Sequence, residues 1–565
     1  MEQTYAIELH NITKRFGSVT ANDKVSLTLR KGEILCVLGE NGSGKTTLVN
    51  MISGIYYPEE GKITVDGREV RIRSPKDSFD LGIGMVHQHF KLVDILTAAE
   101  NIILGLQDEV ETHSEAGEGR SGIPALKRLR RGASRQVIDM KRVVADINAL
   151  TEKYGFELDP YQKIYEMSVS QKQTVEIVKM LYRGARILIL DEPTAVLTPQ
   201  EADRLFAVLR NMKNDGCSII LITHKLHEVL AVSDRVSVLR KGHYIDTVNT
   251  SEATVASLTE MMVGAKVDLN IERPEPKNPV KRLELKNVTC TTKDGLHSLD
   301  HASLTVYGGE ILGIAGIAGS GQKELLEAIA GLEPVSEGTV TFYPGENQPR
   351  EITNLDVAGI RKLGVRLAFV PEDRLGMGLV GSMDMTDNMM LRSYRRGRSE
   401  FLDRRTPGKL AEKVKDQLEI VTPSISAPVG RMSGGNVQKV LVGREIAQHP
   451  KVLMVAYPTR GIDINSSYTI YHLLNEQKEH GVAVICVIED LDVLMELCDR
   501  IAVLCGGQIT GIVDGRTAKK EELGVLMTKH MAHLSDEEPV PEERSQSSGA
   551  SGIASGQDRR GGAGK

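Results

Sequence analysis

Short apolar runs alternate with amphipathic stretches along most of this chain. The apolar runs are rich in β-branched and aliphatic residues, which is typical of buried strands. The clearest ones in the first half are 32–38, 84–87, 187–190, 218–222 and 235–239. Between them, apolar residues recur at helical spacing over 46–52, 171–182 and 199–213. This alternation predicts an α/β fold with a mostly parallel sheet that is covered by helices.

The second half of the chain repeats the first half, and the spacing is constant over the stretch that begins at Arg186. The run Arg186–Thr194 reads RILILDEPT, and the run Lys451–Thr459 reads KVLMVAYPT. Residues 233–239 return in the same way as residues 498–504. A repeat of this length indicates a duplicated domain rather than a solenoid.

Composition divides the chain further. We expect a first domain over 1–266, a linker over 267–281 that carries three prolines, and a second domain over 282–536. The segment 107–135 has no counterpart in the second half and runs from acidic to basic. We interpret it as a solvated loop and leave contact of its basic end with lipid headgroups open. Residues 537–565 are rich in Ser, Gly and charge, so we expect a disordered tail.

The overall composition limits the classes of protein. The 565 residues are too many for one core, and 41% hydrophobic with 26% charged residues is ordinary for globular domains. A formal net charge of −6 argues against nucleic acid as the main partner. We find no apolar run of transmembrane length and no signal peptide. The six cysteines form no C-x-x-C pair, which favours reduced, buried thiols.

The run from Gly39 to Thr46 reads GENGSGKT and matches the phosphate-binding pattern G-x-x-x-x-G-K-[ST]. It follows an apolar strand and opens a helix, which is the context that the pattern requires. Glycines let backbone N–H groups turn towards phosphates, the lysine reaches the β- and γ-phosphates, and the threonine hydroxyl suits Mg²⁺. The residues expected to bind nucleotide here are Gly39, Asn41, Gly42, Ser43, Gly44, Lys45, Thr46 and Thr47.

Polar residues follow three of the predicted strands, where phosphoryl transfer needs charge and positioning. Asp191 ends one apolar run and is expected to hold Mg²⁺, and Glu192 is expected to polarise the attacking water. Gln88 is expected to contact the metal or that water, and His224 the γ-phosphate. Phe16, upstream of the loop, is expected to stack on adenine, with a place in the core as the alternative.

These features resemble the nucleotide-binding domains of ABC transporters. The resemblance rests on Asp191–Thr194, on His224 and on Met432–Gln438, which reads MSGGNVQ and is similar to the ABC signature L-S-G-G-x-Q. A Ser-Gly-Gly turn opens a helix whose N–H groups attract phosphate. The resemblance implies two tandem P-loop ABC ATPase domains that bind ATP and Mg²⁺, each a mostly parallel sheet core with a helical subdomain. The signature residues expected to bind ATP are Ser433, Gly434, Gly435 and Gln438.

The second phosphate loop, Gly316–Lys323, is degraded and reads GIAGSGQK. In the aligned second half Lys45 becomes Gln322, Gln88 becomes Glu372, Asp191 becomes Ala456, Glu192 becomes Tyr457, His224 becomes Glu489, and Phe16 maps near Lys293. In ABC proteins two domains meet head to tail, with each ATP between one loop and the other signature. The resemblance therefore implies one competent site, from the first loop and the second signature. The other site would not hydrolyse ATP. Glu372 and Glu489 would add negative charge near its phosphates, and its signature has Ser170 where a glycine is usual.

The fused pair with one degraded loop resembles the ATPase subunit of bacterial importers for simple sugars and nucleosides. This implies separate membrane permease subunits, indirectly a solute-binding protein, no nucleic acid, and a peripheral place on the cytoplasmic face of the inner membrane. The apolar-rich segment 90–103 is expected to contact the permease, with an ordinary core helix as the alternative. A tandem ABC ATPase that acts on ribosomes or DNA is the rival, although it usually has two competent sites. A nucleotide-sensing scaffold is a second rival, against which Glu192 and His224 argue.

One short motif bears on the cargo. Residues 86–93 read VHQHFKLV, with His89 directly after the glutamine. The sugar branch of this importer family more often has an acidic residue at that place. The motif therefore favours nucleosides over simple sugars, and a riboflavin-like compound remains an alternative cargo.

Overall fold

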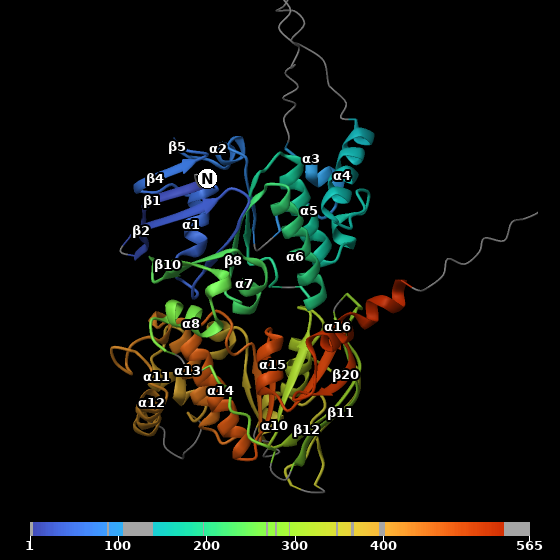
Figure 1. Ribbon diagram of the computed structural model, residues 1–565. Helices are drawn as coiled ribbons and strands as arrows, with labels where there is room; N and C mark the ends of the chain where they lie inside the picture. The colour runs from blue at the N-terminus through green and yellow to red at the C-terminus, as the bar shows by residue number, and fades with distance from the viewer. Residues whose placement is uncertain are drawn as a thin grey trace, which may run out of the picture.

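The computed structural model describes residues 4–17, 19–87, 90–105, 139–195, 197–266, 269–276, 279–292, 294–345, 348–362, 367–394 and 402–535. These residues form two halves, drawn one above the other in Figure 1, and each half contains a six-stranded and a four-stranded sheet. The strand order is the same in both halves, as expected for a duplicated domain. None of the described helices is both long and apolar enough to cross a bilayer.

The six-stranded sheet of the first half has the order β10-β9-β3-β8-β7-β6. Its strands are β3 (Ile34–Leu38), β6 (Ile83–Val86), β7 (Ile187–Asp191), β8 (Ser218–Thr223), β9 (Arg235–Arg240) and β10 (His243–Asn249). β10 pairs antiparallel with β9, and the other neighbours pair in parallel. β3, β7 and β8 are buried along their whole length, which explains their continuous apolar runs. The predicted parallel core is confirmed.

A four-stranded antiparallel sheet, β2-β1-β4-β5, was not predicted. Its strands are β1 (Tyr5–Phe16), β2 (Val19–Arg30), β4 (Glu60–Val65) and β5 (Arg68–Val70). Buried and exposed residues alternate along β2, so its apolar positions are diluted by polar ones. The search for continuous apolar runs could not detect such a strand.

The helices of the first half divide between the sheet and a helical subdomain. They are α1 (Lys45–Ile52), α2 (Pro75–Asp80), α3 (Ala98–Ile103), α4 (Met140–Tyr154), α5 (Val169–Tyr182), α6 (Pro199–Asn214), α7 (Leu226–Val232) and α8 (Val255–Val263). α3, α4 and α5 share a separate core around Ile102, Ile147 and Val175. Ser168 caps α5 by accepting a hydrogen bond from the backbone N–H of Gln171. The expected helical subdomain is therefore present.

The second half repeats this plan with the sheets β16-β17-β18-β13-β19-β20 and β12-β11-β14-β15. Its strands are β11 (Val280–Thr291), β12 (His297–Gly308), β13 (Ile311–Gly316), β14 (Glu337–Phe342), β15 (Arg350–Glu351), β16 (Leu367–Val370), β17 (Val452–Ala456), β18 (Ala483–Val487), β19 (Arg500–Cys505) and β20 (Gln508–Asp514). Its helices are α9 (Gln322–Ala330), α10 (Val357–Lys362), α11 (Met385–Met390), α12 (Arg405–Gln417), α13 (Gly434–Ile446), α14 (Ile464–Glu479), α15 (Leu491–Leu497) and α16 (Lys520–Ser535). All six cysteines are free and buried, which agrees with the expected thiols.

The two halves meet in opposite orientations. In Figure 1 the α1 side of the first half lies over α13 of the second, and α6 lies over α16. Gln200 of α6 donates a hydrogen bond of 3.0 Å to the backbone carbonyl of Glu521 in α16. Glu40 accepts one of 3.2 Å from the backbone N–H of Ile464, where α14 begins. Each half therefore presents its sheet to the helical side of the other.

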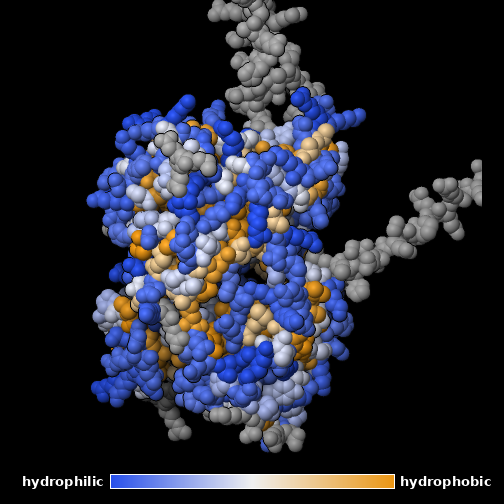
Figure 2. Space-filling view, in the orientation of Figure 1, coloured by the Kyte–Doolittle hydropathy of each residue, from blue (hydrophilic) through white to orange (hydrophobic). Residues whose placement is uncertain are grey.

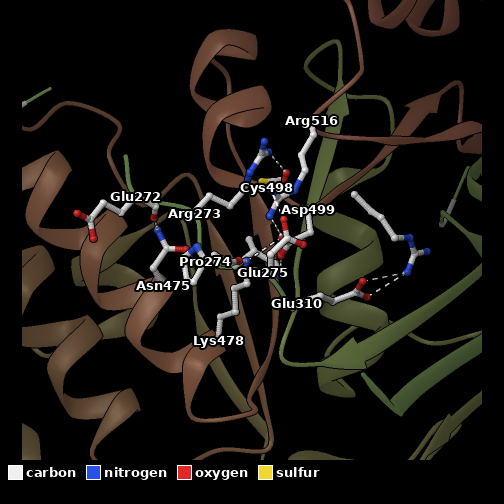
Figure 3. Close-up of polar contacts among 12 residues, drawn as sticks. Glu272, Arg273, Pro274, Glu275, Glu310, Asn475, Lys478, Cys498, Asp499 and Arg516 are labelled. Carbon is white, nitrogen blue, oxygen red and sulfur yellow. Dashed lines mark hydrogen bonds and ion pairs between the residues drawn. The ribbon is translucent and has the colours of Figure 1, made fainter. Parts of the chain in front are cut away.

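The middle of the linker, residues 269–276, lies against the second half, and we call it the linker strap. Figure 3 shows its polar contacts. Arg273 donates to the carbonyls of Met495 and Cys498, at 2.8 and 2.6 Å. Lys478 donates to the Pro274 carbonyl and forms an ion pair of 2.7 Å with Asp499. The strap therefore covers this ion pair.

We expect Lys478→Met to destabilise the second half by about 3–5 kcal/mol, because it leaves the buried Asp499 with only the more distant Arg516, at 4.0 Å, as a cation. The Lys478 side chain is 1% exposed and that of Asp499 6% exposed. The aligned first-half pair, Lys213 and Asp234, is 30% and 35% exposed. Lys213→Met is therefore the matched control, with an expected cost below about 1 kcal/mol. Denaturant titration followed by hydrogen exchange in each half measures both, and equal costs would contradict the role given to the strap.

Candidate nucleotide site

The first phosphate loop joins the end of β3 to the start of α1. Gly44, at the helix N-cap, has φ +96°, and a Cβ there would lie 2.3 Å from the Ala21 carbonyl oxygen. A Cβ on Gly39 would lie 2.3 Å from the Leu239 carbonyl oxygen. Both positions therefore require glycine, and they pack the loop tightly against neighbouring strands.

Lys45 extends into the interior of this loop. Its Nζ donates hydrogen bonds to the carbonyls of Gly39 and Glu40, at 2.7 and 2.9 Å. Only 6% of the residue is exposed. Burial lowers the pKa of its ammonium group, while Glu192 and Asp191 oppose that shift. A cation is thus held inside a ring of backbone groups, as a phosphate-binding loop requires.

Asp191 lies at the carboxyl end of β7, where its side chain accepts a hydrogen bond from Thr46. The residue is 8% exposed. Burial, followed by repulsion from Glu192, raises the pKa of its carboxyl group to about 6. A carboxylate beside a threonine hydroxyl is an all-oxygen donor pair, and such donors fit Mg²⁺.

Glu192 has an unusual backbone, with φ +48°. Its N–H donates to the Ile222 carbonyl of β8 at 2.9 Å, which fixes the residue across the strand ends. Its Oε1 lies 2.9 Å from Nδ1 of His224. This hydrogen bond is the main reason that the pKa of Glu192 is lowered, against an opposing effect of burial. The adjacent carboxyls therefore have pKa values shifted in opposite directions, a pattern found in acid–base sites.

Phe16 ends β1 and is 44% exposed, which does not fit a place in the core. Its ring lies edge-on to Tyr56 at 5.3 Å between centroids. Lys14 lies over both Phe16 and Tyr57, with its Nζ 5.4 and 5.2 Å from the ring centroids. Sequence reasoning missed both tyrosines, because only the fold brings the chain after α1 beside β1. The group offers an aromatic surface for a base.

The second signature begins α13. Ser433 is its N-cap, and the Ser433 Oγ accepts a hydrogen bond from the N–H of Asn436. A Cβ on Gly435 would lie 2.6 Å from the Ser466 Oγ and 2.8 Å from Asp463, so the turn needs glycine there. Gln438 is 1% exposed, and its amide has no hydrogen-bond partner among the described residues. Gln438 is thus buried within the second half.

A chain of contacts connects this signature to the first loop. Gly435 packs on Asp463 and Ser466, Asp463 precedes Ile464, and the Ile464 N–H donates to Glu40 of the first loop. Burial raises the pKa of Glu40, and Asp463 contributes in the same direction. Sequence reasoning named neither Glu40 nor Asp463, because their proximity arises only from the docking of the halves.

Gln88, His89 and Lys293 lie outside the described residues, so their expected roles stay predictions. The other first-half residues, Lys45, Thr46, Asp191, Glu192 and His224, converge at the carboxyl edge of β3, β7 and β8.

The family model "ABC transporter" matches residues 22–195 and 299–460, one match in each half. The chain belongs to the ABC transporter family. It is 41% identical to the nucleoside import ATP-binding protein NupA of Lactococcus lactis subsp. cremoris, over 93% of this chain and 99% of that protein. It is 40% identical to the glucose import ATP-binding protein TsgD13 of Haloferax volcanii, over 92% and 95%. It is 39% identical to the guanosine import ATP-binding protein NupO of Bacillus subtilis, over 93% and 97%.

As a member of this family the chain is an ATPase coupled to solute import. Its second half keeps the backbone of the site but not its chemistry. Tyr457 has φ +47°, and its N–H donates to Val487, as Glu192 donates to Ile222. Gln322 donates to the Ile317 carbonyl at 3.0 Å, whereas Lys45 reaches two carbonyls of its own loop. Ala456 and Tyr457 line a cavity of about 240 Å³ beside this second loop.

The expected excess of negative charge in the second half needs a correction. Glu372 and Glu489 are both bound by the Arg460 guanidinium, which the alignment of the two halves did not consider. The aligned first-half residue is Ala195. These two carboxylates are therefore neutralised in part by a cation that the first half lacks.

We expect Mg²⁺-dependent ATP binding to weaken by about tenfold between pH 7 and pH 5, because a proton competes for Asp191 below a pKa of about 6. The effect of this pKa shift on folding stability is a separate matter. Because the pKa of Asp191 is raised from 3.8 to about 6, its contribution to the free energy of unfolding is fully present below pH 3.8 and is lost as the pH rises through 6. Calorimetric titration at each pH measures the affinity. Asp191→Asn should bind more weakly at pH 7 and lose this pH step, and a wild-type step in that variant would refute the assignment.

Proposed function

We propose that this chain hydrolyses ATP at a single site, between the first phosphate loop and the second signature, and that hydrolysis drives import of nucleosides or simple sugars. One observation carries the proposal: Glu40 of the first loop is hydrogen-bonded to the start of α14, next to the second signature. The family membership supplies the activity, and this contact supports the pairing of loop and signature.

The roles of the residues follow from charge and geometry. Lys45 and the loop N–H groups hold the β- and γ-phosphates, and the N-terminal turn of α13, with Ser433 and Gly434, approaches them from the other half. Glu192 stays ionised, because His224 hydrogen-bonds it, and it orients and polarises the attacking water. Thr46 and Asp191 would hold Mg²⁺, which neutralises charge on the phosphates when bound. The adenine base would lie on Phe16.

The partners are membrane permease subunits, which would place this chain peripherally on the cytoplasmic face of the membrane. The segment 90–103 divides in two in the structure. Val93 and Ile95 are 39% and 75% exposed, whereas Ala98 and Ile102 of α3 are buried. We assign the exposed part to the permease and the helix to the core. Figure 2 shows further apolar side chains gathered where the halves meet.

For the cargo we favour nucleosides. The sequence motif around His89 supports this choice, and so do the two relatives named for nucleoside and guanosine import, whereas further relatives at 33–36% identity are named for ribose or xylose import. The glucose importer of Haloferax volcanii keeps a sugar as the alternative. The rival that acts on ribosomes or DNA is not retained, because these relatives are named as import proteins.

The cargo is tested on the cognate solute-binding protein, titrated by calorimetry with nucleosides, pentoses, hexoses and riboflavin. We expect tight binding of a nucleoside. Tight binding of a hexose with no heat from any nucleoside would refute the cargo but leave the ATPase unaffected.

A further inference from the structure

Three positions differ together between the two halves. The first half has Gln88, Ala195 and His224, and the second has Glu372, Arg460 and Glu489 at the aligned places. In the second half Arg460 binds both carboxylates. Nη1 of Arg460 donates to Glu372, and its Nε lies 3.4 Å from Oε1 of Glu489. We call these three residues the arginine clamp.

The arginine clamp spans three adjacent strands. β17 lies between β16 and β18 in the sheet. Glu372 follows β16, Glu489 follows β18, and Arg460 follows β17. The guanidinium therefore connects the segment that follows β16 to the segment that follows β18. Two donors on a planar fork can hold two carboxylates in fixed directions, which an ammonium group cannot do.

Neighbouring groups hold the clamp in place. Arg374 donates to the carbonyl of Arg460 and so fixes its backbone. The guanidinium also lies 5.8 Å from the centre of the Tyr457 ring, within the range of a cation–π contact. Burial, with Glu489 and Glu372 as further causes, raises the pKa of the Tyr457 hydroxyl to about 12, so this ring stays neutral beside the clamp. The clamp therefore lies beside Ala456 and Tyr457, the residues that replace the acidic strand end of the first half.

In the first half the aligned places would be connected through bound nucleotide instead. The sequence predicts that Gln88 contacts the metal or the attacking water and that His224 contacts the γ-phosphate, so bound Mg²⁺-ATP would connect the residues after β6 and β8. This step rests on the proposed function. In the second half a positive group binds two negative ones, whereas in the first half the negative phosphate would lie between an amide and an imidazole. A bridge made of side chains needs no nucleotide.

We propose that Arg460 is a positioning residue that takes the place of a γ-phosphate in the second half. It holds the loops after β16 and β18 in one arrangement whether or not nucleotide is present. The first half then changes with each ATP while the second half remains fixed and offers its signature to the first loop. A ligand shifts a conformational equilibrium only by its differential affinity, so a half that is already bridged has little left to gain from ATP.

Each contact of the clamp is about half exposed, with side chains 40–55% exposed, so one ion pair alone contributes little. The expected effect is local. In the full-length Glu192→Gln chain, hydrogen exchange is measured over β6 and β8 and over 367–378 and 487–491, with and without Mg²⁺-ATP. We expect ATP to slow exchange in the first pair of segments and to leave the second pair unchanged.

Arg460→Ala installs the first-half residue at this position. We expect it to raise exchange over 367–378 and 487–491 by about fivefold without ATP, the change that one or two exposed ion pairs produce. Arg460→Lys keeps the positive charge but loses the two separate donors of the guanidinium. It should therefore protect from exchange only one of the two segments, either 367–378 or 487–491. Arg204→Ala is the matched control, because it removes a surface ion pair with Glu157 in the first half.

The outcomes separate the two proposals. If ATP slows exchange in the first half and Arg460→Ala changes nothing in the second, the clamp is refuted and the proposed function stands. If the wild-type second half responds to ATP as strongly as the first, the clamp is also refuted. If ATP changes neither half, the proposed site itself is wrong.

Discussion

Glu192→Gln should reduce steady-state ATP hydrolysis by about 100-fold or more while ATP stays bound, because general-base assistance contributes factors of about 10²–10⁴. Glutamine keeps the size of the side chain and a hydrogen bond to His224, but it cannot accept the proton of the attacking water. The bound phosphates keep Lys45 and the loop N–H groups. Phosphate release measures turnover, and a nucleotide-binding titration measures retention.

Tyr457→Phe is the matched control for this variant, since Tyr457 occupies the aligned position with the same left-handed backbone. We expect it to leave turnover within about twofold of wild type, because the second site has no acidic strand end to work with. Wild-type turnover in Glu192→Gln would refute the site assignment. A large loss in Tyr457→Phe would show that the second site is active.

Gly434→Asp should lower transport-coupled hydrolysis by at least about tenfold, because it places a carboxylate where the γ-phosphate is bound. A Cβ on Gly434 would lie 3.3 Å from Nη1 of Arg374, so this flexible side chain must shift slightly, and 3.5 Å from the Gly461 carbonyl oxygen, an ordinary contact. Gly434→Ala therefore separates charge from size, and we expect it to keep most of the activity.

The same charge in the first signature should do much less. Ser170 lies in the first turn of α5, hydrogen-bonded to Ser168. In the proposed head-to-tail arrangement it belongs to the second site, where Ala456 replaces the metal ligand. Ser170→Asp should therefore leave hydrolysis within about twofold of wild type. Equal damage from Gly434→Asp and Ser170→Asp would contradict the asymmetry of the two sites.

Much of the fold was predictable because its core strands are buried on both faces. β3, β7 and β8 are continuous apolar runs, and residues with a predicted chemical role lie at or directly after their ends: the loop from Gly39, Asp191 with Glu192, and His224. The antiparallel sheet was not predictable in this way, because half of each strand faces polar surroundings. The burial of Lys478 was also hidden, since it depends on where the linker strap lies.

The residues of the site were likewise predictable in part. Lys45, Thr46, Asp191 and Glu192 are neighbours in short sequence motifs whose spacing carries their roles. Glu40 and Ile464, in contrast, meet only through the docking of the two halves. The pairing of Arg460 with both Glu372 and Glu489 was missed for a related reason: an alignment compares positions one at a time, and the three residues act as a group.

The central claim is that one chain has one competent ATP site. The most direct test counts the Mg²⁺-ATP molecules that remain on the full-length Glu192→Gln chain after removal of free nucleotide, with photo-crosslinking to identify the half that is labelled. We predict one ATP per chain, with the label near Phe16 of the first half. Two tightly held ATP molecules per chain, or a label of equal strength in the second half, would contradict the account.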